Sequence, residues 1–174
     1  MPKSDNKKLA LSLIMLIIGM SLLAYASVPL YNLFCKVTGY GGTTQIAKNR
    51  ADHIGNRKLE IRFDANTSPD LPWEFKPEQN SVNVTTGENM LVFYFAYNKS
   101  SQPIIGTAVY NVTPHKAGKY FNKIQCFCFS EQLLTPNQQV HMPVSFFIDP
   151  EFDNDPEMND VNSITLSYSF FKVK

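Results

Sequence analysis

The chain has 174 residues, of which 44% are hydrophobic and 18% are charged. This length is typical of one domain, and the apolar fraction is enough for a sizeable core. The 16 lysines and arginines nearly balance the 15 aspartates and glutamates, so composition gives no support for nucleic acid as a partner.

An uncharged apolar segment lies near the N-terminus. Residues 9–28 read LALSLIMLIIGMSLLAYASV and follow Lys3, Lys7 and Lys8. At about 1.5 Å per residue, the segment would span roughly 30 Å as a helix, which matches the hydrocarbon core of a bilayer. The sequence predicts a single transmembrane anchor, with residues 1–8 held in the cytoplasm by their lysines.

Two other interpretations of this segment can be weighed. Ala24-Tyr25-Ala26 resembles a signal-peptide cleavage site, but the apolar region of a signal peptide is usually about 7–15 residues, so the length favours a retained signal-anchor. A buried helix of a soluble domain is disfavoured because the segment has no polar face. With either an anchor or a signal peptide, the rest of the chain lies outside the cytoplasm.

Residues 29–57 lack a sustained hydrophobic period and include a glycine-rich stretch. They are predicted to form a juxtamembrane tether, with Cys35 near its start and a structured element around the glycines left open.

From residue 58 to residue 174 the pattern changes to that of β-structure. Short segments rich in β-branched and aromatic residues alternate with turn residues, which predicts about seven strands in an all-β, immunoglobulin-like β-sandwich. These segments are 58–65, 81–86, 90–98, 104–112, 123–129, 140–149 and 163–173. The proline-rich stretch between the first two is expected to be a loop or edge segment, with Trp73 and Phe75 filling one end of the core.

The acidic stretch at 149–160, DPEFDNDPEMND, superficially resembles a calcium loop. It lacks the glycine that such a loop needs for its sharp turn, and it contains two prolines. We therefore expect a solvated connection between strands.

Two of the three cysteines, Cys126 and Cys128, are separated by one residue in the stretch CFCF. In a strand they share one face, while Phe127 and Phe129 share the other. Burying each phenylalanine side chain contributes about 2 kcal/mol, so the phenylalanines are expected to face the core and the thiols to face outward.

Spacing alone leaves three interpretations of this pair open, namely reduced core cysteines, a metal site and a redox pair. The two Cα atoms would lie roughly 6.6 Å apart, near the upper limit for a disulfide. Two thiolates suit Cu(I) best and Zn(II) second. Free neighbouring thiols outside the cytoplasm would be prone to oxidation, which shifts weight toward a metal site. His141 and Met142 could add ligands, but on an apolar strand such residues are more often packing residues.

Four features follow one another along the chain, namely the N-terminal anchor, YNLFCKVTGYGGTTQ after it, CFCFSEQ in the β domain and the later MPVSFFIDPE. In this combination the chain is similar to the CtaG-type cytochrome c oxidase assembly proteins. The resemblance implies an immunoglobulin-like domain on a single-pass inner-membrane anchor. It also implies Cu(I) binding by Cys126 and Cys128, and a role for Cys35 in copper transfer or in a thiol redox cycle. The implied function is delivery of copper to the Cu(B) site of cytochrome c oxidase subunit I.

The sequence shows no nucleophile–base arrangement and no phosphate loop, so we expect a chaperone rather than an enzyme. The alternative is a membrane-tethered thiol oxidoreductase that uses Cys126, Cys128 and Cys35 without stable metal. Expected partners are subunit I, a periplasmic copper donor or thiol reductant, and the membrane, while a homodimer that shares copper is left open. The short N-terminus without a transit peptide favours a bacterial inner membrane, with the domain in the periplasm, over a mitochondrial one.

Overall fold

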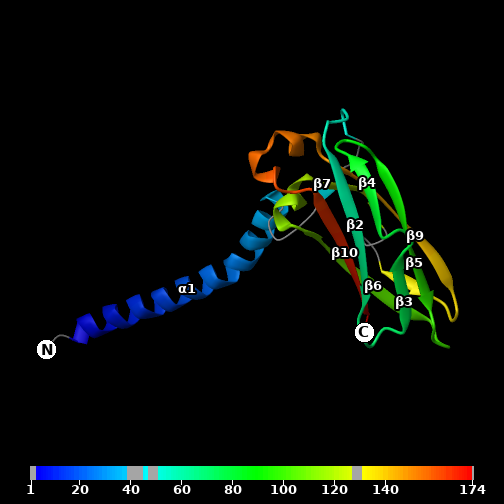
Figure 1. Cartoon of the computed structure of the whole chain (residues 1–174). Coiled ribbons are helices and arrows are strands. Elements are labelled where there is room, and N and C mark those ends of the chain that lie inside the picture. Colours follow the sequence, from blue (N-terminus) through cyan, green and yellow to red (C-terminus); the bar gives the residue numbers. More distant parts are fainter. Residues whose placement is uncertain (1–2, 39–44, 47–50, 127–130, 174) are drawn as a thin grey trace.

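The computed structural model describes residues 3–38, 45–46, 51–126 and 131–173, and side chains within these ranges for residues 6–35, 51–124 and 131–173. A long N-terminal helix leads into a domain made of two β-sheets (Figure 1).

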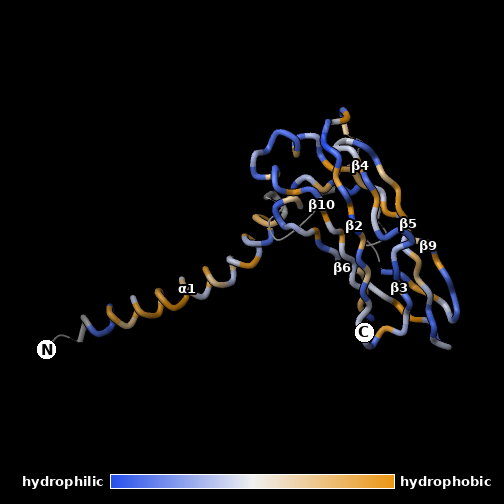
Figure 2. The backbone as a smooth tube through the Cα atoms, viewed as in Figure 1, coloured by the Kyte–Doolittle hydropathy of each residue, from blue (hydrophilic) through white to orange (hydrophobic). Residues whose placement is uncertain are grey.

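Helix α1 runs from Lys3 to Thr38 and is longer than the predicted anchor at both ends. Its segment Asn6–Cys35 is long and apolar enough to cross a membrane, and none of its most apolar part is buried in the protein. Figure 2 shows this helix as a mainly hydrophobic tube that stands away from the domain. Pro29 lies inside the helix, where it removes one backbone hydrogen bond without ending the helix. The first part of the predicted tether is thus helical.

Ten strands of the described chain form two five-stranded sheets. In spatial order, the first sheet contains β1 (Gln45–Ile46), β7 (Phe121–Cys126), β9 (Gln139–Ile148), β5 (Met90–Asn98) and β3 (Trp73–Pro77). The second contains β4 (Ser81–Thr85), β2 (Lys58–Thr67), β10 (Ser163–Lys172), β6 (Ile104–Thr113) and β8 (Gln132–Leu134).

The core follows from alternation along the strands. In β10, Ile164, Leu166, Tyr168 and Phe170 are fully buried, while the residues between them are partly exposed. Strand β2 begins with the same pattern. Because alternate residues of a strand point to opposite faces, each sheet presents one apolar face to the other. The predicted all-β sandwich is confirmed.

The structure also differs from the sequence-based expectation. Strands β1 and β8 were not predicted. Strand β2 pairs in parallel with β10 and antiparallel with β4. Strand β3 is an edge strand, and its Trp73 and Phe75 are buried as expected. The acidic stretch contains two short 3-10 helices, η4 (Pro150–Asn154) and η5 (Pro156–Met158). A third, η2 (His115–Tyr120), immediately precedes β7.

Candidate functional site

Strand β7 carries the first cysteine of the predicted copper pair. It lies between β9 and the short edge strand β1. Its register with β9 places Gln125 opposite Ser145 and Cys126 opposite Val144. The register shifts between Lys123 and Gln125, which indicates a β-bulge, and a bulge bends a strand locally. The backbone is therefore irregular just before the cysteine.

The start of β7 is fixed in the core. Phe121 and Lys123 are fully buried, and the Phe121 ring stacks on Phe146 with centroids 4.9 Å apart. The Lys123 amine lies over the ring of Tyr110, 2.6 Å from its centroid. Burial lowers the pKa of Lys123 to about 6, because the charged ammonium is poorly solvated in the core. The sequence pattern of β7 did not predict a buried lysine at this position.

The predicted arrangement of the cysteine pair lies outside the described residues. This applies to the side chain of Cys126 and to all of Phe127, Cys128 and Phe129. The bulge bears on the prediction, because an extra residue in a strand changes the in–out alternation beyond it. The outward orientation of the two thiols therefore stays a prediction.

The two residues considered as further ligands differ in their surroundings. Met142 is buried and packs in the hydrophobic core. His141, the preceding residue, is exposed, and its Nδ1 contacts Glu78 while its ring meets the edge of Phe95. Successive residues of a strand point to opposite faces, so these two side chains do not share a face. Among the described residues, no group of three or more His, Cys, Asp and Glu side chains could hold a metal ion.

Cys35 lies near the C-terminal end of α1, is partly exposed and forms no disulfide among the described residues. The sequence predicted a tether at this position, but the helix continues to Thr38. At about 1.5 Å per residue, the seven helical steps from Val28 to Cys35 span roughly 10 Å. Cys35 therefore lies closer to the end of the predicted anchor than it would at the end of an extended tether of the same length.

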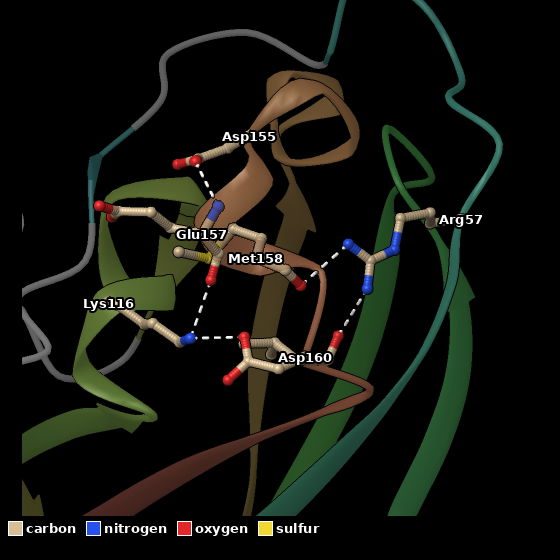
Figure 3. A network of polar contacts seen from close by, with 7 residues as sticks. Arg57, Lys116, Asp155, Glu157, Met158 and Asp160 are labelled. Carbon is tan, nitrogen blue, oxygen red and sulfur yellow. Dashed lines mark hydrogen bonds and ion pairs between the residues drawn. The ribbon is translucent and has the colours of Figure 1, made fainter.

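A polar cap covers the end of the sandwich where η2, η4 and η5 meet (Figures 1 and 3). We use the name cap for residues 149–160 together with η2 and Arg57. The guanidinium of Arg57 donates to the carbonyls of Met158 and Val161, at 3.0 and 2.8 Å, and lies over the Phe152 ring. Lys116 donates to the Glu157 carbonyl at 2.8 Å.

A second set of contacts joins η2 to η5. The Asp155 carboxylate accepts hydrogen bonds from Tyr120 at 2.6 Å and from Lys119 at 2.9 Å. Its other oxygen accepts from the backbone N–H of Glu157. These donors hold the pKa of Asp155 down at about 2. Since η2 leads directly into β7, the cap positions the start of the strand that carries Cys126.

The expectation of a purely solvated connection at 149–160 was therefore incomplete. Within this stretch, the side chains of Phe152 and Met158 are fully buried, and carboxylates of the stretch make specific contacts. The sequence carries a signal for this, because Asp-Pro-Glu occurs twice, at 149 and at 155. In each copy the aspartate caps a short helix and proline occupies the first turn, which is a favoured helix start.

The fold and site define a class of protein, a β-sandwich domain on an N-terminal helix of membrane-spanning length, in which strand β7 includes the first cysteine of a Cys-x-Cys motif. The family model described as cytochrome c oxidase assembly protein CtaG/Cox11 matches residues 27–172. The chain belongs to the CtaG/Cox11 family.

Curated relatives agree with this assignment over nearly the whole chain. The chain is 54% identical to the cytochrome c oxidase assembly protein CtaG of Ehrlichia ruminantium (strain Welgevonden), over 93% of this chain and 92% of that protein. It is 48% identical to the CtaG protein of Ruegeria sp. (strain TM1040), over 99% and 89%. It is also 48% identical to the mitochondrial COX11 protein of Arabidopsis thaliana, over 98% of this chain and 63% of that protein. These names support a role in the assembly of cytochrome c oxidase.

Proposed function

We propose that the chain is a membrane-anchored Cu(I) chaperone, not an enzyme, that delivers copper to the Cu(B) site of cytochrome c oxidase subunit I. The observation that carries the proposal is the Cys126-Phe127-Cys128 motif, at the end of a strand fixed in the core, in a chain of an oxidase-assembly family. Cu(I) is the cargo, and the two thiolates would hold it.

The chemistry of the available side chains supports copper over harder metals. Paired thiolates without a neighbouring set of carboxylates are soft ligands and favour Cu(I). The thioethers of Met142, Met158 and Met90 are also soft ligands, but the first two side chains are buried in the core and Met90 packs against it. This leaves the cysteine pair as the principal soft donor of the domain, with Cys35 as a third thiol on the helix.

The proposed setting is an inner membrane, with the N-terminus in the cytoplasm and the sandwich in the periplasm. Lys3, Lys7 and Lys8 precede the uncharged segment and would stay on the cytoplasmic side. The next charged residue is Lys36, directly after Cys35. Cys35 would thus lie at the far membrane–water boundary, close to a membrane-embedded partner such as subunit I.

Anaerobic Cu(I) titration of the full chain in detergent tests copper binding. The parent protein should bind Cu(I) tightly, and Cys126→Ser and Cys128→Ser should each abolish tight binding, because one thiolate cannot chelate. Cys35→Ser is the matched control and should keep nearly the full affinity. Tight binding that survives both single substitutions in the pair would contradict the proposal. A metal-free protein with a readily formed internal disulfide would support the thiol oxidoreductase instead.

Delivery is tested in cells by oxidase activity in membranes that contain only the Cys35→Ser protein at normal level. We expect a sharp loss of activity, because Cys35 would form an exchange intermediate during transfer. Activity equal to that of the parent strain would exclude this role for Cys35 and would assign transfer to the Cys126–Cys128 pair alone.

A further inference from the structure

Between α1 and β2, two parts of the chain that the structure describes are attached to the sandwich. The first is β1, which pairs in parallel with the start of β7, Gln45 opposite Asn122 and Ile46 opposite Lys123. The attachment is therefore made to the strand that carries Cys126, three residues before that cysteine. It lies only ten residues beyond Cys35 along the chain, from residue 35 to residue 45.

The second attachment comes just before β2, at residues 55–57. The Gly55 N–H donates to the Thr86 carbonyl at 2.7 Å, and the Thr86 N–H donates back to the Arg57 carbonyl at 3.0 Å. The Asp153 carboxylate accepts from the backbone N–H of Asn56 at 2.7 Å and from the Thr86 hydroxyl at 3.0 Å. Carboxylate and backbone groups thus hold this stretch against the cap.

Two glycines show how closely the chain is packed at this second attachment. A Cβ atom on Gly55 would lie 2.2 Å from the Thr86 hydroxyl oxygen and 2.5 Å from the Asp153 carboxylate. Gly87 has a φ of +79°, and a Cβ there would lie 2.1 Å from the His53 carbonyl oxygen. Gly55 leaves room for the side chains of Thr86 and Asp153, whereas Gly87 adopts a positive φ and faces the backbone of His53 and Ile54.

We propose that β1 and the stretch 55–57 act together as a strap, two attachments that keep Cys35 within short reach of the strand that carries Cys126. The inference rests on the proposed function for one assumption, that copper is exchanged between these thiols. It goes further by assigning a positioning role to β1 and to the stretch 55–57, neither of which touches the metal in the proposal.

The lengths of chain give the size of the effect. With β1 in place, seven steps separate Thr38 from Gln45, and seven steps can span at most about 25 Å. With both attachments lost, twenty steps separate Thr38 from Lys58, and the limit rises to about 70 Å. Effective concentration falls with roughly the −3/2 power of linker length, so the strap should raise the encounter rate of the two thiols about fivefold.

The rate of disulfide formation between Cys35 and Cys126 measures this encounter without copper. The full chain with Cys128→Ser is kept dilute and metal-free in detergent, and diamide is added. The two thiols are oxidised to a disulfide while diamide is reduced to the hydrazine.

Two substitutions weaken the attachments. Ile46→Pro removes an N–H from β1 and disfavours its pairing, and Gly55→Ala forces the second attachment apart. We expect the double variant to react about fivefold more slowly than the parent, and Gly55→Ala alone to react at nearly the parent rate because β1 still holds.

Two glycine substitutions provide matched controls. Gly19→Ala meets no atom within 4 Å and should change nothing, whereas Gly106→Ala would clash with the Trp73 ring at the other end of the sandwich. The latter should lower the melting temperature without slowing the cross-link, which separates positioning from mere stability. Any of three results would overturn the proposal. The double variant could react at the parent rate, the parent chain could form no Cys35–Cys126 disulfide, or the Gly106→Ala chain could react as slowly as the double variant. Because no copper is present, none of these outcomes depends on whether the protein is a copper chaperone.

Discussion

The two ends of the sandwich are closed by different kinds of interaction. At the end away from the cap, Trp73, Phe75 and Phe170 pack together, with ring centroids 5.3 Å and 4.7 Å apart for the two pairs that involve Phe170. At the cap, Arg57 and Asp155 hold short helices through hydrogen bonds to carbonyls, an amide and a hydroxyl. The aromatic end depends on apolar burial, which does not change with pH. The cap depends on charged groups, and it is the end to which the segment after α1 is attached.

The aromatic end should show the largest effect of a single substitution. Phe170→Ala removes a fully buried ring and leaves a cavity between Trp73 and Phe75, so we expect a loss of about 4 kcal/mol in the free energy of unfolding. The loss should be equal at pH 4 and pH 7, because no charge is involved. Urea unfolding followed by the fluorescence of Trp73, the single tryptophan, measures it. A loss that differed markedly between the two pH values would contradict closure by apolar burial alone.

Lys123 is a titratable group within the apolar interior, and it sharpens the comparison. Its pKa is lowered to about 6 in the folded chain, whereas the unfolded chain has an ordinary lysine pKa near 10.4. Between these values the unfolded state binds one more proton, so stability should rise with pH by up to about 1.4 kcal/mol per unit. Lys123→Met should remove this contribution and raise stability at pH 7.

The slope of stability against pH between 7 and 9, compared for parent and Lys123→Met chains, checks this prediction. Lys58→Met is the matched control, because Lys58 is exposed at the start of β2. Parallel pH profiles for the parent and Lys123→Met would show that burial does not shift the titration of this lysine.

The cap should respond to loss of its arginine by a smaller amount. Arg57→Leu keeps an apolar contact with Phe152 but leaves the carbonyls of Met158 and Val161 without their guanidinium donor. We expect a loss of about 2 kcal/mol, since a hydrogen bond to a charged group contributes roughly 1.5–3 kcal/mol. Arg62→Leu is the control, because its exposed pair with Glu60 is screened by solvent and should contribute much less. Equal losses for the two variants would show that Arg57 has no special role in the cap.

The aromatic end was largely predictable from the sequence, and the long-range contacts of the cap were not. Alternation identified the strands, and the isolated aromatic residues of the proline-rich stretch indicated that Trp73 and Phe75 close the core. The alternation of apolar and polar residues is a local property of the chain, so strands can be recognised from it without knowing which strands pair. The contacts of Arg57 join residues about a hundred positions apart, and no local pattern indicates them.

The candidate site was predictable in part for the same reason. Local spacing identified the pair Cys126 and Cys128, and the strand that ends at Cys126 is present. The bulge before Cys126 arises from the register between β7 and β9, which is a long-range property. The helical setting of Cys35 was missed because the glycine-rich stretch after it suggested a tether, whereas the run of uncharged residues continues to Cys35 itself.

The smallest and most specific effect concerns the pH dependence of the cap. Tyr120, Lys119 and the Glu157 amide lower the pKa of Asp155 from its usual value near 3.8 to about 2. A carboxyl whose folded pKa is depressed stabilises the fold above its unfolded pKa, and the contribution is lost as pH falls through the folded value. The contribution of Asp155 should therefore be complete above about pH 4 and absent below about pH 2.

Asp155→Asn tests this pH dependence. The substitution should lower stability at pH 7 yet leave it unchanged near pH 2, so the acid-unfolding curves of the variant and the parent should converge. Asp64→Asn, on the exposed face of β2, is the control and should follow the parent curve, since it removes a carboxylate without touching the cap. If Asp155→Asn ran parallel to the parent down to pH 2, the acid sensitivity of the domain would have to come from other carboxylates, and the contrast between the two ends would lose its electrostatic basis.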